Sequence, residues 1–236
     1  MVMRTSVQYS ASLLALAALA LCAASRLQAQ STATPVAGNG TYIASDPLAN
    51  VRYDNRFDVS LGMAYDHMKA GPNLLQGSNL GGLDLSASYW FSRHWAAEGS
   101  GRAYLGTSGA APNTESINGP FVREYLFTAG PEWLGPHNKH GDLIAHALVG
   151  GANFDSHLGA GKNHTPLTAG FYNNQTAPAA IIGGHIDLNR SPSLVFRITP
   201  DAVITRYSIN YGNKVTQTDV NFAISVGVQY KFKTKR

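Results

Sequence analysis

Large apolar residues alternate with polar or small residues in the part of the chain that follows residue 55. In the stretch 56–66 every second residue is large and apolar, and each residue between them is charged, polar or small. Because successive side chains of a β-strand point to opposite faces, this stretch predicts a strand with one apolar and one polar face. The alternation recurs in seven further stretches: 83–91, 95–105, 124–129, 143–150, 180–188, 194–205 and 220–232.

The connections between these stretches alternate in length. Short connections alternate with long ones, which span residues 67–81, 106–119, 153–178 and 207–218. Outer-membrane barrels have an even number of antiparallel strands, short periplasmic turns and long extracellular loops, and a strand of about 9–11 residues crosses the bilayer. We therefore predict an all-β fold, an eight-stranded antiparallel transmembrane up-and-down β-barrel formed by residues 56–232, with both of its ends in the periplasm.

Aromatic residues gather near the ends of the predicted strands. Membrane barrels carry aromatic girdles at both interfaces, because a ring with a polar edge suits the headgroup level. A soluble β-sandwich or a lipocalin-like barrel also alternates, with the apolar face inward. The unequal connections and the aromatic positions favour the membrane barrel, since a soluble barrel needs neither. The predicted girdle residues are Tyr65, Tyr89, Trp90, Phe91, Trp95, Tyr104, Trp133, Tyr230 and Phe232.

The polar faces of the predicted strands carry charged residues that a barrel would turn inward. The interior of an eight-stranded barrel is just wide enough to be filled by side chains, and an unpaired buried charge is costly. We therefore predict that Arg102 and Arg197, whose planar guanidinium groups suit carboxylates, pair with neighbouring acids and plug the lumen. This structural network is predicted to contain Asp84, Glu98, Arg102, Glu124, His146, His185, Asp187, Arg197 and Asp201, with Asp58 on the same face.

The N-terminal segment has the features of a secretory signal peptide. Arg4 is followed by an apolar run of 12 residues, 13–24, and then by small residues up to Gln30. A membrane-spanning helix needs about 20 apolar residues, so we predict that residues 1–30 are a signal peptide that is removed. Lipidation of Cys22 is the alternative; without it the exported chain has no cysteine and no disulfide. Residues 31–55 are small, polar and proline-bearing, and are predicted to be a poorly ordered periplasmic leader.

Composition agrees with an exported barrel. Removal of residues 1–30 leaves 16 basic and 14 acidic residues, a net charge of +2. This near balance argues against a dedicated nucleic-acid-binding protein, which usually carries a basic stripe. Charged residues make up only 14% of the chain, and glycine and aromatic residues are frequent. That combination suits a protein with one face toward lipid.

Four segments of the C-terminal half resemble a known family. They are GDLIAHALVGGA (141–152), IIGGHIDL (181–188), RITPDAVITRY (197–207) and NFAISVGVQYKF (221–232). They are similar to small outer-membrane β-barrel proteins of the OmpA/OmpX-like, acidobacterial type. The resemblance covers residues 120–232 and implies a membrane barrel, insertion by the barrel-assembly machinery and no catalytic residue.

The chain departs from that family's pattern at three places. His185 stands where the family usually has a third glycine, and Ala202 stands where an aromatic residue often follows the aspartate. A basic tail, residues 233–236, follows the terminal aromatic residue, where related chains often stop.

The sequence offers only weak candidates for catalysis or metal binding. Asp155, Ser156 and His157 contain the residue types of a hydrolase, but neighbours on a strand point apart. His137 and His140 flank a turn with too few further ligands for a structural metal site. We therefore predict no enzyme, cofactor or metal.

The predicted function is a structural or surface-contact role in the cell outer membrane. The alternatives are a narrow porin-like channel, disfavoured by the small lumen, and a lipid A-modifying barrel enzyme. The expected partners are outer-membrane lipid and lipopolysaccharide, the assembly machinery, and a surface ligand at the four long loops. Nucleic acid is not an expected partner.

Overall fold

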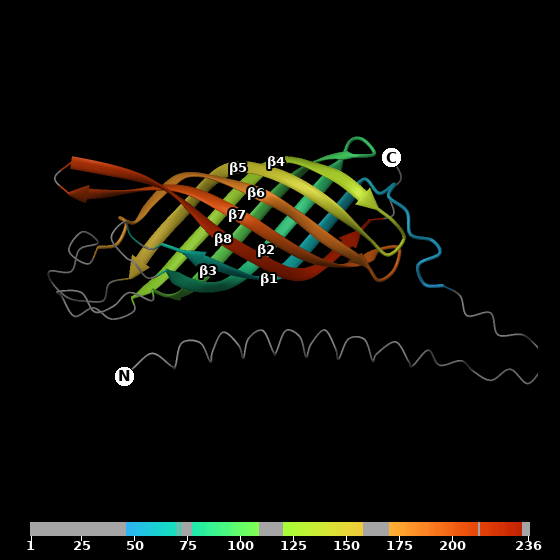
Figure 1. Ribbon diagram of the computed structural model, residues 1–236, viewed down its shortest axis with the longest axis horizontal. Coiled ribbons are helices and arrows are strands. Elements are labelled where there is room, and N and C mark those ends of the chain that lie inside the picture. Colours follow the sequence, from blue (N-terminus) through green and yellow to red (C-terminus); the bar gives the residue numbers. More distant parts are fainter. Residues whose placement is uncertain are drawn as a thin grey trace, which may run out of the picture. The chain divides into compact units, whose positions relative to one another are not determined.

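The computed structural model describes residues 46–69, 71, 77–108, 120–157, 170–211 and 213–232 (Figure 1). The chain divides into two compact units, Met1–Ala44 and Ser45–Arg236. The predicted signal peptide and the basic tail at 233–236 lie outside the described residues, as does part of the predicted leader. The described part of the chain contains no helix long and apolar enough to cross a membrane.

Eight β-strands follow one another along the second unit, as the alternation predicts. Each strand pairs antiparallel with the next, and β8 pairs with β1, so that the sheet closes into a barrel. Neighbouring strands in the sequence are therefore neighbours in space throughout. The strands are β1 (Phe57–Met68), β2 (Ser78–Trp90), β3 (Trp95–Thr107), β4 (Phe121–His137), β5 (Gly141–His157), β6 (Gln175–Asn189), β7 (Leu194–Tyr211) and β8 (Asn213–Lys231).

The two ends of the barrel differ. Tight turns join β2 to β3, β4 to β5 and β6 to β7, and we call this the turn end; the opposite end, with the longer connections, is the loop end. The prediction of a loop at 207–218 is wrong. There β7 and β8 continue as a paired ribbon up to Tyr211 and Asn213, beyond the last β6–β7 pair, at Thr205, and the last β1–β8 pair, at Phe222.

That ribbon projects at the left of Figure 1, opposite the blue segment that precedes β1. The sequence predicts a loop here because Ser208, Asn210 and Asn213 are polar residues common in turns. Cross-strand pairing of β7 with β8 nevertheless continues as far as Tyr211 and Asn213. We call residues 206–218 the ribbon.

The outside of the barrel is apolar. Large hydrophobic side chains of all eight strands are exposed, among them Met63 at 77%, Phe127 at 69% and Val149 at 68%. Soluble proteins rarely expose a continuous apolar surface of this extent, whereas membrane barrels need one. The exterior therefore fits a bilayer.

Two residues of the predicted aromatic girdle point inward instead. Trp90 and Tyr104 are 5% and 0% exposed, because Tyr89 and Leu105 next to them take the outward positions of their strands. The indole Nε1–H of Trp90 donates to Asp58 Oδ2 over 2.6 Å. The other predicted girdle residues, from Tyr65 to Phe232, are exposed.

The interior is layered along the barrel axis. A belt of charged side chains lies between an apolar and aromatic layer toward the loop end and a smaller one toward the turn end. The first layer includes Leu80, Tyr104, Leu126, Phe154 and Tyr207. The second comprises Trp90, Ala96, Leu134 and Ile144, with Tyr53 against it.

The last residues of the predicted leader are ordered against the barrel, which corrects that prediction for the residues from 46 onward. The hydroxyl of Tyr53 donates to the carbonyl of Asn138 over 2.8 Å and accepts from Asn189 Nδ2 over 2.7 Å. The Lys231 ammonium lies 4.6 Å from the Tyr53 ring centroid. Partial burial and the Asp142 carboxylate raise the pKa of Tyr53. Tyr53 therefore covers the turn end as a neutral phenol.

Candidate functional site

The charged belt contains a chain of contacts that crosses the lumen. Arg102 of β3 lies 2.5 Å from Asp201 of β7 on the opposite wall, measured from Nη2 to Oδ2, and 3.5 Å from Asp84 of β2. Ser225 of β8 donates to the other oxygen of Asp84 over 2.8 Å. Arg102 therefore ties together walls that share no backbone hydrogen bond, as the predicted plug requires.

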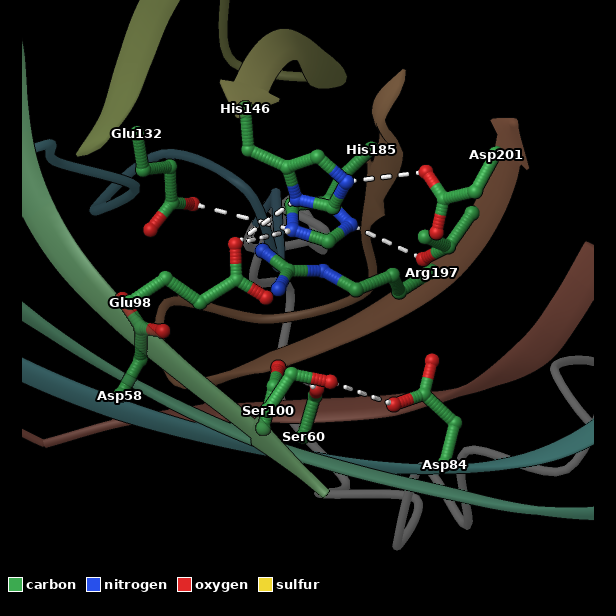
Figure 2. Close-up of polar contacts among 12 residues, drawn as sticks. Asp58, Ser60, Asp84, Glu98, Ser100, Glu132, His146, His185, Arg197 and Asp201 are labelled. Carbon is green, nitrogen blue, oxygen red and sulfur yellow. Dashed lines mark hydrogen bonds and ion pairs between the residues drawn. The ribbon is translucent and has the colours of Figure 1, made fainter. Parts of the chain in front are cut away.

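His146 of β5 continues this chain of contacts from Asp201 to Glu98. Its Nε2 lies 2.9 Å from Asp201 Oδ1, and its Nδ1 lies 2.7 Å from Glu98 Oε2 (Figure 2). An imidazole held between two carboxylates uses both ring nitrogens as donors when it is protonated. The backbone at Gly183 makes room, since a Cβ there would lie 1.9 Å from Asp201 Oδ1.

His185 of β6 approaches the same carboxylate from the other side. Its Nε2 lies 3.4 Å from Glu98 Oε2, and its Nδ1 lies 2.9 Å from the hydroxyl of Thr199. The two imidazole rings meet edge to face with their centroids 4.6 Å apart. Both histidines therefore turn one nitrogen toward Glu98 and the other toward a different partner.

Arg197 of β7 forms the second predicted arginine pair. Its Nε and Nη2 donate to the two oxygens of Asp187 over 2.8 and 2.7 Å, and the two residues are direct partners across the β6–β7 ladder. Both side chains are at most 4% exposed. This parallel pair of hydrogen bonds is the strong, specific geometry of arginine and carboxylate.

Glu124 is the one predicted network residue that lies apart from the belt. It is buried in the apolar layer near the loop end, where it accepts from the hydroxyl of Tyr207 over 2.6 Å. Its other oxygen, Oε2, has no hydrogen-bond partner among the described residues.

Replacing Tyr207 with phenylalanine is expected to lower the free energy of unfolding by about 1.5–3 kcal/mol, because it removes a buried hydrogen bond to a carboxyl group. The measurement is urea unfolding in lipid vesicles. Tyr230→Phe is the matched control, since Tyr230 is 48% exposed on the outer face and should change stability little. Equal effects of the two substitutions would contradict the assigned contact.

Two acidic residues of the belt were not predicted from the sequence. Glu132 of β4 is fully buried beside the histidines, with its Oε1 4.0 Å from His185 Nε2. Asp142 of β5 pairs with Lys231 of β8 over 3.3 Å near the turn end. The predicted fourth strand ends at residue 129, before Gly130 and Pro131. If the strand is continued, its inward positions are every second residue from Thr128, and Glu132 is one of them.

The weaker sequence candidates do not form sites in the structure. Ser156 is buried and its hydroxyl donates to Asn174, whereas Asp155 lies on the other face and pairs with Arg123 over 3.5 Å. His157 is exposed at the end of β5. His137 lies 2.9 Å from the carbonyl of Gly135, through its Nδ1, and His140 is exposed.

Comparison with known proteins finds similarity only at the level of structure. No family model and no curated protein sequence matches the chain. The outer membrane protein OprG from Pseudomonas aeruginosa superimposes with a TM-score of 0.56 at 15% identity, covering 78% of this chain and 99% of that protein. Neisserial surface protein A superimposes with a TM-score of 0.50 at 15% identity, covering 75% and 97%.

At these identities the similarity shows the fold alone. A closed eight-stranded antiparallel barrel with an apolar exterior and a charged interior is the fold of the small outer-membrane β-barrel proteins, whose strands span the membrane. The comparisons give no support to the narrower acidobacterial group that the C-terminal segments resemble.

Proposed function

We propose that this protein is an integral protein of the cell outer membrane whose lumen is closed to solutes and whose loop end contacts a ligand at the cell surface. Its immediate surroundings are then outer-membrane lipid and lipopolysaccharide, reached with the help of the barrel-assembly machinery. The single observation that carries this proposal is the filled interior: paired charges between two apolar layers.

Three features support a closed lumen. Arg102 and His146 connect opposite walls at the level of the belt. Tyr53 and Trp90 cover the turn end, where the void lined by these residues has a volume of about 10 Å³. That volume barely accommodates one water molecule. Among the described residues, these contacts obstruct the path of a hydrated ion or a nutrient along the barrel axis.

The loop end offers the better surface for a partner. The ribbon is braced from inside by residues 170–175: Gln175 bonds to both backbone groups of Ser208, and the hydroxyl of Tyr172 donates to Asp219. Lys214 and Thr216 are exposed on it. Rigid scaffolds commonly carry their recognition surfaces on such projecting segments.

Planar-bilayer recording tests the closed lumen. The wild-type barrel should give no steady single-channel openings. Arg102→Ala, which removes the cross-lumen contact, should give openings more often than wild type, and the rim variant Arg123→Ala should not. Frequent steady openings of the wild type would favour the narrow porin-like channel instead.

Cysteine labelling on intact cells tests which end faces outward. Cys22 lies in the predicted signal peptide and is the only cysteine of the chain, so a single introduced cysteine reports its own site. A membrane-impermeant maleimide should label Lys214→Cys on intact cells and Lys139→Cys only after permeabilisation. The reverse pattern would contradict the orientation, and comparison of lipid A by mass spectrometry with and without expression tests the enzymatic alternative.

A further inference from the structure

The barrel interior as a whole holds more negative than positive groups. Among the described residues ten carboxyl groups are buried, against the three cations Arg102, Arg197 and Lys231 and the two histidines His146 and His185. Even two protonated histidines leave carboxyl groups without a cation. Because a buried charge without a partner is costly, such an interior takes up protons or a further cation.

Two of these carboxyl groups, Glu98 and Glu132, lie with both histidines where four strands meet in the lumen. Glu98, Glu132, His146 and His185 come from β3, β4, β5 and β6, and each of their side chains is at most 2% exposed. One ligand atom each of Glu98, His146 and His185 lies within 4.8 Å of the other two. Figure 2 shows the Glu98 and Glu132 carboxyl groups directed toward the two imidazole rings.

Glu132 reaches this cluster without a close hydrogen bond, although the charges of His185 and Arg197 lie near it. Neither of its carboxyl oxygens has a hydrogen bond to any described residue, although the side chain is completely buried. Glu98 Oε1 is likewise without one. Groups of this kind in a native interior call for an explanation, and an unseen ion is one.

The outer contacts of the histidines have the arrangement found around metals. Metal-binding histidines usually hold their second ring nitrogen against a carboxylate or another acceptor, which fixes the ring orientation. His146 Nε2 lies 2.9 Å from Asp201, and His185 Nδ1 lies 2.9 Å from the Thr199 hydroxyl. The nitrogens left over, His146 Nδ1 and His185 Nε2, both face Glu98.

We propose that the cluster of Glu98, Glu132, His146 and His185 binds one divalent transition-metal ion of the zinc class. Two imidazole nitrogens and two carboxylate oxygens are donors that zinc accepts in a closed tetrahedral site, with bonds of about 2.0–2.2 Å. Donors in such a site lie about 3.3 Å apart. The separations of Glu98 from the two histidines, 2.7 and 3.4 Å, are close to that spacing. Glu132 lies 4.0 Å from His185 and would have to move closer to become the fourth ligand.

The ion would bind the lone pair of His146 Nδ1, so zinc competes with a proton at that nitrogen and its binding weakens as the pH falls. With four protein ligands the site has no open position for a substrate, which makes it structural rather than catalytic. This inference adds a metal ion to the charged belt that is proposed to close the lumen. It depends on the closed lumen only because an open lumen would let the ion escape.

The test is zinc content of the whole barrel, folded in detergent with ZnCl₂ present and then desalted. We expect about one zinc per chain for wild type. Glu132→Gln and His185→Asn should each weaken binding at least about tenfold, as loss of metal-site residues does. Glu124→Gln is the matched control. Glu124 is a buried glutamate of the same strand as Glu132, but it contacts Tyr207 and not the cluster.

Further measurements separate loss of the metal site from misfolding and from an open lumen. Co²⁺ in place of Zn²⁺ should give the visible absorption of a tetrahedral site in wild type and in Glu124→Gln. A gel shift on boiling shows separately that each variant has folded, and conductance separately tests the closed lumen. Folded wild type without zinc would overturn the proposal. A second outcome would also overturn the proposal: zinc that remains bound to Glu132→Gln and to His185→Asn. In that case, loss of zinc from the double variant His137→Asn/His140→Asn would place the ion at the turn-end histidines.

Discussion

Replacing Arg197 with methionine is expected to destabilise the barrel by about 3–5 kcal/mol, the cost of leaving one member of a buried ion pair alone. Asp187 would keep its buried position but lose both donors. The measurement is the free energy of unfolding in urea with the protein in lipid vesicles. Any ligand binding at the loop end should be unaffected by this substitution.

Two matched variants separate the ion pair from the loss of an arginine as such. Arg123→Met removes the Asp155 pair at the rim, where both side chains are more than 30% exposed, so it should cost less than about 1 kcal/mol. Arg197→Met/Asp187→Leu removes both charges and should recover most of the stability, since apolar replacements of a buried pair are often neutral. An unchanged unfolding free energy for Arg197→Met would disprove the pairing.

Replacing Leu85 with arginine is expected to cost about 2–4 kcal/mol in a bilayer, as charged residues do at the midplane of a membrane barrel. Leu85 is 54% exposed and lies in the middle of β2, between its cross-strand partners Leu61 and Gly101. In a water-soluble barrel the same exposed position would accept arginine readily. The substitution therefore tests which solvent the apolar face meets.

Val215→Arg provides the control. Val215 is 49% exposed, close to the exposure of Leu85, but it lies on the ribbon beyond the closed part of the barrel. Arginine there should change the free energy of unfolding by less than about 1 kcal/mol, because the cost falls toward the interface. Equal and small effects at both positions would mean that the outer face is not in lipid.

The sequence predicts the strands of the barrel wall well, because the face to which a strand residue points depends only on its place in the alternation. Alternation with period two assigned the faces of all eight strands, including the fifth, whose inward positions carry the apolar Ile144 and Leu148. It also placed Arg197 and Asp187 on the same interior face, where they form the pair described above.

The sequence did not predict which side chains meet across the lumen, because these residues lie far apart in the chain. Arg102 and Asp201 are 99 residues apart and sit on strands that do not pair, so no local pattern relates them. Glu132 was missed because Gly130 and Pro131 before it are residues that usually interrupt strands. Proline is tolerated there because the pairing of β4 with β5 is interrupted at Gly130 and Pro131, while Pro131 keeps its place opposite Ala97 of β3.

The two ends of the barrel were predicted less well than its middle. The sequence predicts a loop at the ribbon because residues common in turns interrupt the alternation there, although β7 and β8 remain paired. Tyr53 was assigned to a loose leader because a single tyrosine gives no periodic signal. Its contacts with Asn138, Asn189 and Lys231 come from three different parts of the barrel.

The most direct test of a transmembrane barrel in the outer membrane is gel electrophoresis of outer-membrane fractions, unboiled against boiled, with the chain expressed from residue 1. The account predicts that the protein is found in this fraction and that its band shifts on boiling, because a closed barrel in lipid resists detergent until it is heated. Recovery of the protein in the soluble periplasmic fraction, with no shift on boiling, would contradict it.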